Sequence, residues 1–134
     1  MKKLRDIMRE GFLFAVRKDA TVAEAARTMT EKNVGIVVVL ENERLIGVFS
    51  ERDAVRQVID KGLDPAATPV GEVMTTDLVV ADENDDYQSA MRIMDRAHIR
   101  HLPVMRKKQI ISMLSIRDLL RVDMQHGRRA LLSE

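Results

Sequence analysis

Residues 49–54 read Phe-Ser-Glu-Arg-Asp-Ala, and residues 114–119 read Leu-Ser-Ile-Arg-Asp-Leu. The offset between them is 65 (114 − 49), and the same offset aligns residues 15–55 with residues 80–120 without a gap. Identical pairs are Ala25 and Ala90, Arg27 and Arg92, Met29 and Met94, Val39 and Val104, and Ile46 and Ile111. A self-match at a fixed period dictates the architecture. We therefore predict two copies of one unit, which bury their apolar faces against each other and leave related clefts between them.

The composition is that of an ordinary globular chain. Its 134 residues are 46% hydrophobic and 32% charged, which suits one domain-sized unit. The net charge is only +1, and the basic residues alternate with acidic ones instead of forming a stripe. With 3% aromatic residues there are also few side chains on which bases could stack, so we expect no nucleic-acid partner. The absence of Cys excludes disulfides, thiolate metal sites and Cys nucleophiles. No apolar run approaches the ~18 residues of a membrane span, so we expect a cytoplasmic protein without membrane attachment.

Each copy is predicted to have the order β-α-β-β-α. The spacing i, i+3, i+4, i+7 of Val22, Ala25, Ala26 and Met29 is typical of an amphipathic helix. A capping box at residues 21–24 marks its start. Apolar runs at residues 36–40 and 45–49, separated by the polar loop 41–44, predict an antiparallel hairpin.

The second copy repeats this order with runs at residues 102–105 and 110–114 around the loop 106–109. A helix is predicted after each hairpin. The expected fold class is α+β, with mixed sheets, helices on one face and a pseudo-two-fold relation between the repeats. We predict a first repeat over residues 1–62, a connector over 63–72 and a second repeat over 73–134.

On these residues the chain resembles a tandem pair of CBS domains, a family named after cystathionine β-synthase. The family signature, Gly-h-h-Ser/Thr-x-x-Asp (h for hydrophobic) at the entry to the last helix, stands at residues 47–53 and again at 112–118, where Ser112 replaces the Gly. Supporting matches are residues 6–8, 72–74 and 100–104. The resemblance covers residues 4 to about 122.

The resemblance implies a regulatory sensor for an adenosine-bearing ligand: AMP, ADP, ATP, NAD or S-adenosylmethionine. It also implies a homodimer that regulates a protein the sequence does not identify. The alternatives are an interaction scaffold with degenerate clefts, and an enzyme. No P-loop, catalytic triad, metal cluster or paired acids supports an enzyme, and we expect no catalysis.

The Ser-x-x-Asp pairs admit two interpretations. Ser50 with Asp53, and Ser115 with Asp118, would cap helix starts and oppose the helix dipole. The resemblance instead implies that the carboxylates accept hydrogen bonds from ribose hydroxyls, as at other nucleotide sites. One carboxylate can serve both roles.

The two copies differ in their basic residues. Arg100 and His101 stand where the first copy has Gly35 and Ile36. The resemblance implies that Arg100 and His101 bind the phosphate of a ligand whose ribose is held by Ser50 and Asp53 in the other copy. Arg117 would add a third positive group, whereas the cleft with Ser115 and Asp118 would have only Arg52 in the corresponding place.

No metal is expected. His98 and His101 are spaced i, i+3, but a three-ligand site would need carboxylates that the sequence does not place. The acidic run 82–86 lacks the spacing of a calcium loop and is predicted to precede a helix, where acidic residues are favoured.

Overall fold

The chain forms two compact units, each built around a three-stranded sheet. The computed structural model describes residues 2–132, and the side chains of residues 2–126. The first-repeat unit comprises residues 13–78, and the second-repeat unit comprises residues 1–12 with 79–134.

The first-repeat unit contains a mixed sheet. Strand β1 (Ala15–Arg17) pairs parallel with β2 (Ile36–Glu41), which pairs antiparallel with β3 (Arg44–Ser50). Its helices are α2 (Val22–Lys32), the short α3 (Glu51–Asp53), the π-helix η1 (Ala54–Ile59) and the 3-10 turn η2 (Val70–Glu72).

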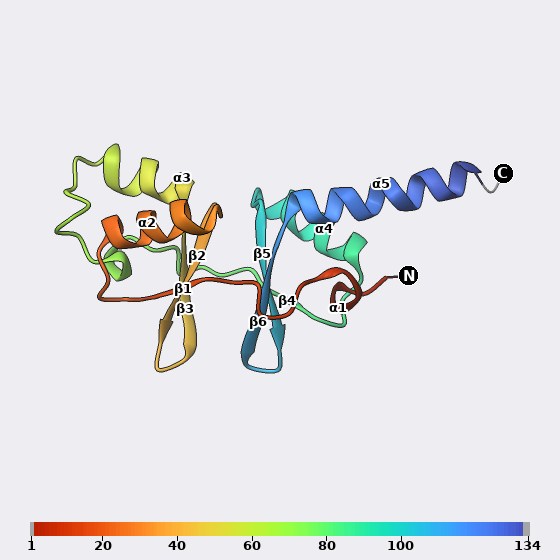
Figure 1. Cartoon of the computed structure of the whole chain (residues 1–134), viewed down its shortest axis with the longest axis horizontal. Helices are drawn as coiled ribbons and strands as arrows, with labels where there is room; N and C mark the ends of the chain where they lie inside the picture. Colours follow the sequence, from red (N-terminus) through yellow and green to blue (C-terminus); the bar gives the residue numbers. More distant parts are fainter. Residues whose placement is uncertain (1, 133–134) are drawn as a thin grey trace. The chain divides into compact units, whose positions relative to one another are not determined.

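The second-repeat unit has the same strand order. Strand β4 (Ala81–Asp82) pairs parallel with β5 (His101–Arg106), which pairs antiparallel with β6 (Gln109–Ser115). Its helices are α1 (Leu4–Ile7), α4 (Tyr87–Ala97) and α5 (Ile116–Leu132). In Figure 1 each sheet has its hairpin turn at one end, and α2 with α3, or α4 with α5, lie near the other. The predicted α+β class with mixed sheets is confirmed. None of the helices within residues 2–132 is both long and apolar enough to cross a bilayer.

The hairpin turns are shorter than predicted. The strands continue to Glu41 and Arg44, which pair with each other, so the turn is Asn42-Glu43 alone. Both turn residues have positive φ, 51° and 65°, as a tight type I′ turn requires. The sequence predicts four-residue loops because all four residues are polar, whereas backbone pairing at the end of a hairpin does not depend on side-chain polarity.

Helix α2 begins and ends as its sequence predicts. Thr21 Oγ1 accepts a hydrogen bond from the Glu24 N–H at 3.1 Å, and the Glu24 carboxylate accepts from the Thr21 N–H at 3.1 Å. The helix ends at Asn33 in the left-handed conformation, and α4 ends the same way at His98, 65 residues later (98 − 33).

Each core receives a segment from before the other repeat. Val70 of η2 is buried in the core of the first-repeat unit, with Val22, Met29 and Phe49. Leu4 of α1 is likewise buried in the core of the second-repeat unit. The segment that precedes each sequence repeat therefore packs in the compact unit of the other repeat. The predicted repeat boundaries remain a prediction.

Two ion pairs at equivalent positions have opposite polarity. Lys18 pairs with Glu41 in the first-repeat unit, and Glu83 pairs with Arg106 in the second, again at an offset of 65 (83 − 18 and 106 − 41). Arg106 donates to both Glu83 oxygens at 2.6 and 3.1 Å and to Glu10 at 2.6 Å. The hydrogen bonds from Arg106 lower the pKa of Glu83, whose side chain is only 12% exposed. The pair thus anchors residue 10 to β5.

Candidate functional site: two Ser–Asp helix starts

The first candidate site is the junction of β3 and α3. Asp53 N–H donates to Ser50 Oγ at 3.2 Å, while Ser50 N–H and Oγ both donate to Asp53 Oδ2, at 3.0 and 3.1 Å. This is a reciprocal capping box, so the structural role predicted for the motif is confirmed here. The cap holds the Asp53 carboxylate in one orientation.

A third residue, Thr75, completes this site. Its hydroxyl donates to Asp53 Oδ1 at 3.1 Å, and its backbone exchanges two hydrogen bonds with Val48 of β3, at 2.8 and 3.0 Å. A carboxylate has about four acceptor positions, so Asp53 can keep these bonds and still accept one from a ligand hydroxyl. The sequence does not predict this role of Thr75, because neither its spacing nor its flanking residues point to a partner 22 residues away.

The second candidate site repeats the capping geometry. Asp118 N–H donates to Ser115 Oγ at 3.2 Å, and Ser115 N–H donates to Asp118 Oδ2 at 3.0 Å. Counting along the leading segments, Arg9 corresponds to Thr75, 66 residues earlier (75 − 9). In the structure, however, the Phe12 carbonyl accepts from the N–H of Met113, the residue equivalent to Val48, so Phe12 takes the place of Thr75 in the backbone pairing. The two sites therefore share a capped carboxylate, but the second has no threonine at the matching place.

The first repeat has Gly47 where the second has Ser112, and this difference has a physical cause. A Cβ at Gly47 would lie 2.5 Å from Met74 Sδ and 3.0 Å from the Thr75 carbonyl oxygen, so only glycine fits beneath this leading segment. In the second repeat, the Ser112 hydroxyl donates to the Arg9 carbonyl at 2.9 Å. The departure from the family motif thus exchanges a close backbone approach for a hydrogen bond.

The predicted basic residues lie beside the second Ser–Asp pair. His101 is opposite Ser115 in the β5–β6 ladder, and the Ile116 N–H donates to the Arg100 carbonyl at 2.8 Å. Arg117 follows directly on α5, and Arg52 holds the matching place on α3. The predicted pairing of Arg100 and His101 with Ser50 and Asp53 would join residues of two different units, and it stays a prediction.

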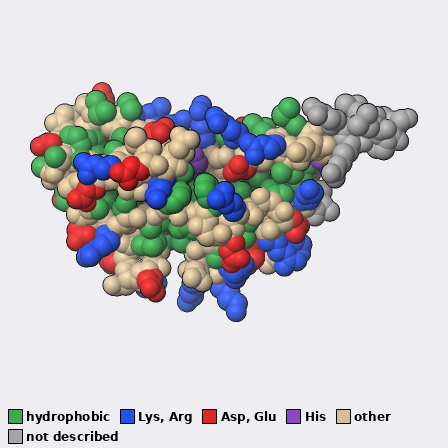
Figure 2. Space-filling model, viewed as in Figure 1, with side chains coloured by type: hydrophobic (Ala, Val, Ile, Leu, Met, Phe, Trp, Pro, Cys, Tyr) green, Lys and Arg blue, Asp and Glu red, His purple; other side chains and the backbone are tan. Residues whose placement is uncertain are grey.

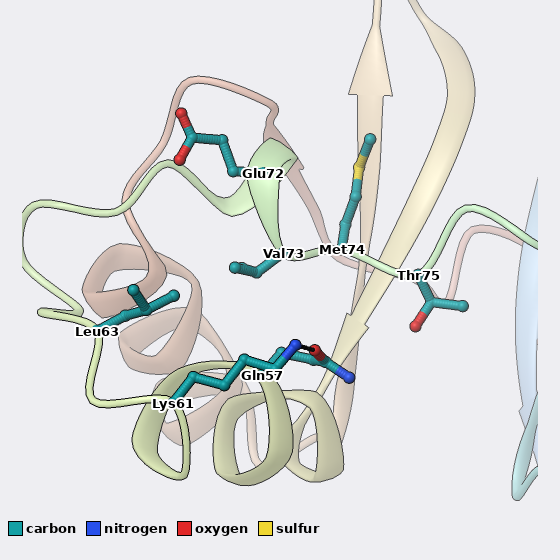
Figure 3. A pocket seen from close by; sticks show the side chains of 7 residues that line it. All are labelled: Gln57, Lys61, Leu63, Glu72, Val73, Met74 and Thr75. Atoms are coloured by element: carbon teal, nitrogen blue, oxygen red, sulfur yellow. Dashed lines mark hydrogen bonds between the residues drawn. The ribbon is translucent and has the colours of Figure 1, made fainter.

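A hollow of about 440 Å³ adjoins the first site (Figure 3). Thr75, which bonds Asp53, is also part of its wall. The residues that line the hollow are Gln57, Lys61, Leu63, Glu72, Val73, Met74 and Thr75. Figure 3 shows Gln57 and Lys61 from η1 and the turn after it, facing the strip of chain that contains Val73 and Met74.

His98, one of the two histidines considered as metal ligands, has a structural role. His98 ends α4 with φ of 55°, as the equivalent Asn33 ends α2. Among the residues that the structure describes, no three His, Asp or Glu side chains are grouped so as to hold a metal ion.

Comparison with known proteins gives consistent matches. The sequence pattern of the CBS domain family matches residues 4–60 and 70–125. The CBS domain-containing protein CBSX3, mitochondrial, of Arabidopsis thaliana is 36% identical over 118 residues, which are 84% of this chain and 57% of that protein. The chain therefore spans little more than half of this relative.

Solved structures share the fold. The CBS domain structure NE2398 has a TM-score of 0.85 and 27% identity, covering 92% of this chain and 98% of the other. Hypoxic Response Protein I, described with two coordinated zinc ions, has a TM-score of 0.79 and 27% identity, covering 90% and 98%. The CBS domain pair of MJ0100, in complex with 5′-methylthioadenosine and S-adenosyl-L-methionine, has a TM-score of 0.82 over 93% and 98%; at 16% identity it shows the fold alone.

Proposed function

The chain belongs to the CBS domain family, and from this we propose that it is a regulatory module that binds an adenosine-bearing ligand at its Ser–Asp helix starts. The observation that carries the proposal is the capped carboxylate of Asp53, held by Ser50 and Thr75 with acceptor capacity to spare. A ribose hydroxyl is a donor suited to the acceptor position that remains on this carboxylate. Asp118 offers a second carboxylate in the same cap.

The phosphate of the ligand is assigned to the basic residues. Arg100 is exposed beside a strand start, and its planar guanidinium is suited to bidentate phosphate contact. In the proposed arrangement Arg100 and His101 serve the ligand held by Ser50 and Asp53, with Arg117 as a third positive group. Arg52 is the corresponding cation for the ligand at Ser115 and Asp118.

A calorimetric screen of AMP, ADP, ATP, NAD and S-adenosylmethionine tests the proposal. At a ligand concentration 100-fold above Kd, mass action stabilises the fold by about 2.7 kcal/mol. For a domain of this size, the melting temperature should rise by roughly 5–15 °C. If no ligand at millimolar concentration shifts it by more than a degree, the interaction-scaffold alternative replaces this proposal.

The same screen distinguishes a sensor from an enzyme. A bound nucleotide should be recovered unchanged after overnight incubation with the protein, because we assign no catalytic residue. Repeating the thermal scans with EDTA and with added zinc checks the proposal that no metal is needed, since a structural zinc site would make stability depend on the chelator.

We further propose that the module acts as a homodimer in the cytoplasm and regulates another protein. Val55 and Ile59 are 56% and 69% exposed, and their equivalents Leu120 and Met124 are 44% and 65% exposed. The same apolar i, i+4 pair is thus exposed on the last helix of each repeat, and Figure 2 shows apolar side chains on the surface of both units. Exposed apolar patches of this kind mark interaction surfaces, and closed two-fold pairs are the commonest assembly.

A further inference from the structure

The chain passes from one compact unit to the other after each leading segment. The segment that ends at Phe12 belongs to the second-repeat unit, whereas β1, which begins at Ala15, belongs to the sheet of the first-repeat unit. Val70 is likewise buried in the core of the first-repeat unit, whereas β4, which begins at Ala81, belongs to the second. Each strand therefore joins a different sheet from the one that its leading segment packs against.

An uncrossed arrangement would avoid both passages: β1 would pair with β5, and β4 with β2. The two strands occupy the same place in their sheets, since each pairs parallel with the central strand. Arg17 of β1 is opposite Leu40. At the 65-residue offset (82 − 17), Asp82 of β4 is opposite Met105. The backbone donors and acceptors of β1 and β4 thus suit either sheet, and exchange of equivalent segments is a common error in repeat proteins.

The charges at the ends of these strands distinguish the two arrangements. Lys18, directly after β1, pairs with Glu41 at the end of β2. Arg106, at the end of β5, pairs with Glu83 directly after β4, and also with Glu10 of the leading segment. In the uncrossed arrangement Lys18 would lie beside Arg106, and Glu83 beside Glu41. Like charges would then replace both ion pairs.

We propose that these two ion pairs of opposite polarity determine which sheet each strand joins, and that Arg106 is the principal residue in this choice. Arg106 attracts Glu10 and repels Lys18, which follows eight residues later (18 − 10). It therefore holds the leading segment in the second-repeat unit and directs β1 to the first. The inference concerns how the fold is specified and does not depend on the proposed ligand.

Repulsion in the uncrossed arrangement contributes more to the choice than attraction in the observed one. The side chains of Lys18 and Glu41 are 58% and 40% exposed, and ion pairs so exposed stabilise a fold only slightly. Glu83 is only 12% exposed and accepts two hydrogen bonds from Arg106, at 2.6 and 3.1 Å. Beside Glu41 it would be a nearly buried carboxylate that has lost its cation and faces a like charge, which is costly.

Disulfide trapping in the whole chain tests the inference, because the sequence contains no cysteine. Arg17→Cys with Leu40→Cys reports the observed pairing of β1, and Arg17→Cys with Met105→Cys reports the uncrossed pairing. Both reporters use positions that are opposite in the strand register, as a disulfide requires. Each protein is refolded from reducing urea into oxidising buffer, and intramolecular cross-links are measured by non-reducing electrophoresis and peptide mass mapping. With native charges, the 17–40 cross-link should form and the 17–105 cross-link should be rare.

Lys18→Glu with Glu41→Lys then reverses the first ion pair and leaves the second as it is. The observed arrangement keeps an attractive pair, so the urea midpoint should hardly change and the 17–40 cross-link should still form. The uncrossed arrangement now has opposite charges at both contacts. The 17–105 cross-link should therefore increase at least about ten-fold.

A rescue variant and a matched control complete the test. Adding Glu10→Arg, Glu83→Arg and Arg106→Glu makes the polarities of the two repeats opposite again, and should return the 17–105 cross-link to its original level. Arg27→Glu with Glu31→Arg exchanges charges at exposed positions on α2 and should change neither cross-link.

Three results would overturn the inference. In the first, Lys18→Glu with Glu41→Lys leaves the 17–105 cross-link at its original level. In the second, that variant loses the 17–40 cross-link, since the reversed pair should hold β1 as well as the native one. In the third, the 17–105 cross-link stays high in the rescue variant. The ligand screen tests the proposed function separately.

Discussion

At the residue scale, the proposed function depends on single carboxylates that combine an observed capping role with a proposed ligand-binding role. Asp53 caps a helix with one oxygen and holds Thr75 with the other. A substitution can therefore alter binding without unfolding the protein only if it keeps the capping bonds. Asparagine meets that requirement, because its side-chain oxygen still accepts from a backbone N–H.

Asp53→Asn should weaken ligand binding roughly 10–150-fold while the protein stays folded. The estimate follows from the loss of a hydrogen bond to a charged group, worth about 1.5–3 kcal/mol. Asp118→Asn should weaken the binding event at the other Ser–Asp pair. Calorimetry on each variant, with the melting temperature as a check on folding, measures both effects.

Arg100→Ala decides how the basic residues are shared. We expect it to weaken AMP, ADP or ATP by a similar factor and hardly to affect adenosine, because its proposed partner is the phosphate. It should damage the same binding event as Asp53→Asn. Were it to follow Asp118→Asn instead, the neighbourhood of Arg100 and Ser115 within one unit would define the site, and the cross-repeat pairing would be wrong.

Glu83 should make the fold sensitive to acid. Its pKa is lowered in the folded state by Arg106, so as the pH falls the unfolded chain takes up the proton first, near the ordinary glutamate pKa of about 4.3. The stability that the pair contributes is present above this pH and is lost below it. Urea midpoints measured from pH 7 to pH 3 should fall less steeply for Glu83→Gln than for the wild type. The matched change at exposed Glu31 on α2 should follow the wild-type curve, and a parallel curve for Glu83→Gln would refute the assignment.

At the element scale, the leading segments complete the sheets. The Thr75 backbone pairs with Val48 along the outer edge of β3, and the Phe12 carbonyl accepts from the Met113 N–H of β6 at 3.1 Å. An uncovered sheet edge is a template for aggregation, and these segments cover it. The same contact brings Thr75 to Asp53, so edge protection and site geometry are linked.

Gly47→Ser should destabilise the first-repeat unit by about 1–3 kcal/mol, because the new Cβ would overlap Met74. Met74→Ala should relieve part of this cost, so urea denaturation of both single variants and the double variant should give a favourable coupling energy. Simple additivity would mean that Met74 is not what requires glycine. Ser112→Gly, the reverse change in the other repeat, should cost only about 0.5–1.5 kcal/mol for its lost hydrogen bond.

At the scale of the whole molecule, the exposed apolar pairs on η1 and α5 should determine the assembly state. Light scattering at micromolar concentration should give about twice the chain mass of 15.2 kDa. Ile59→Asp with Met124→Asp should shift the protein toward the monomer, because a charge at a buried interface is costly. The control Glu31→Lys with Glu43→Lys places charge changes on other exposed positions and should leave the mass unchanged. A wild-type mass near 15 kDa would overturn the homodimer.

Local sequence patterns predicted most of the helices and strands, and they predicted Ser50 and Asp53 of the first site but not Thr75. The period of Val22, Ala25 and Met29 and the capping box at Thr21 identified α2, since both depend on residues within two helical turns. The Ser–Asp caps were readable for the same reason. The sequence predicts a helix after the first hairpin, where η1 lies, but not its π-helical form, because a five-residue hydrogen-bond spacing, such as that from the Asp60 N–H to the Val55 carbonyl, has no distinct residue pattern.

The sequence by itself determined that the protein is a repeated α+β unit of the CBS family, because a constant offset and local periodicity are visible in the order of residues. Only the tertiary structure decided that Thr75 bonds Asp53, that Met74 requires Gly47, and that Gln57 and Lys61 line a hollow beside them. These contacts join the leading segment of one repeat to the core of the other. They depend on which segments pack together to bury apolar surface and satisfy backbone hydrogen bonds, and no spacing along the chain encodes that choice.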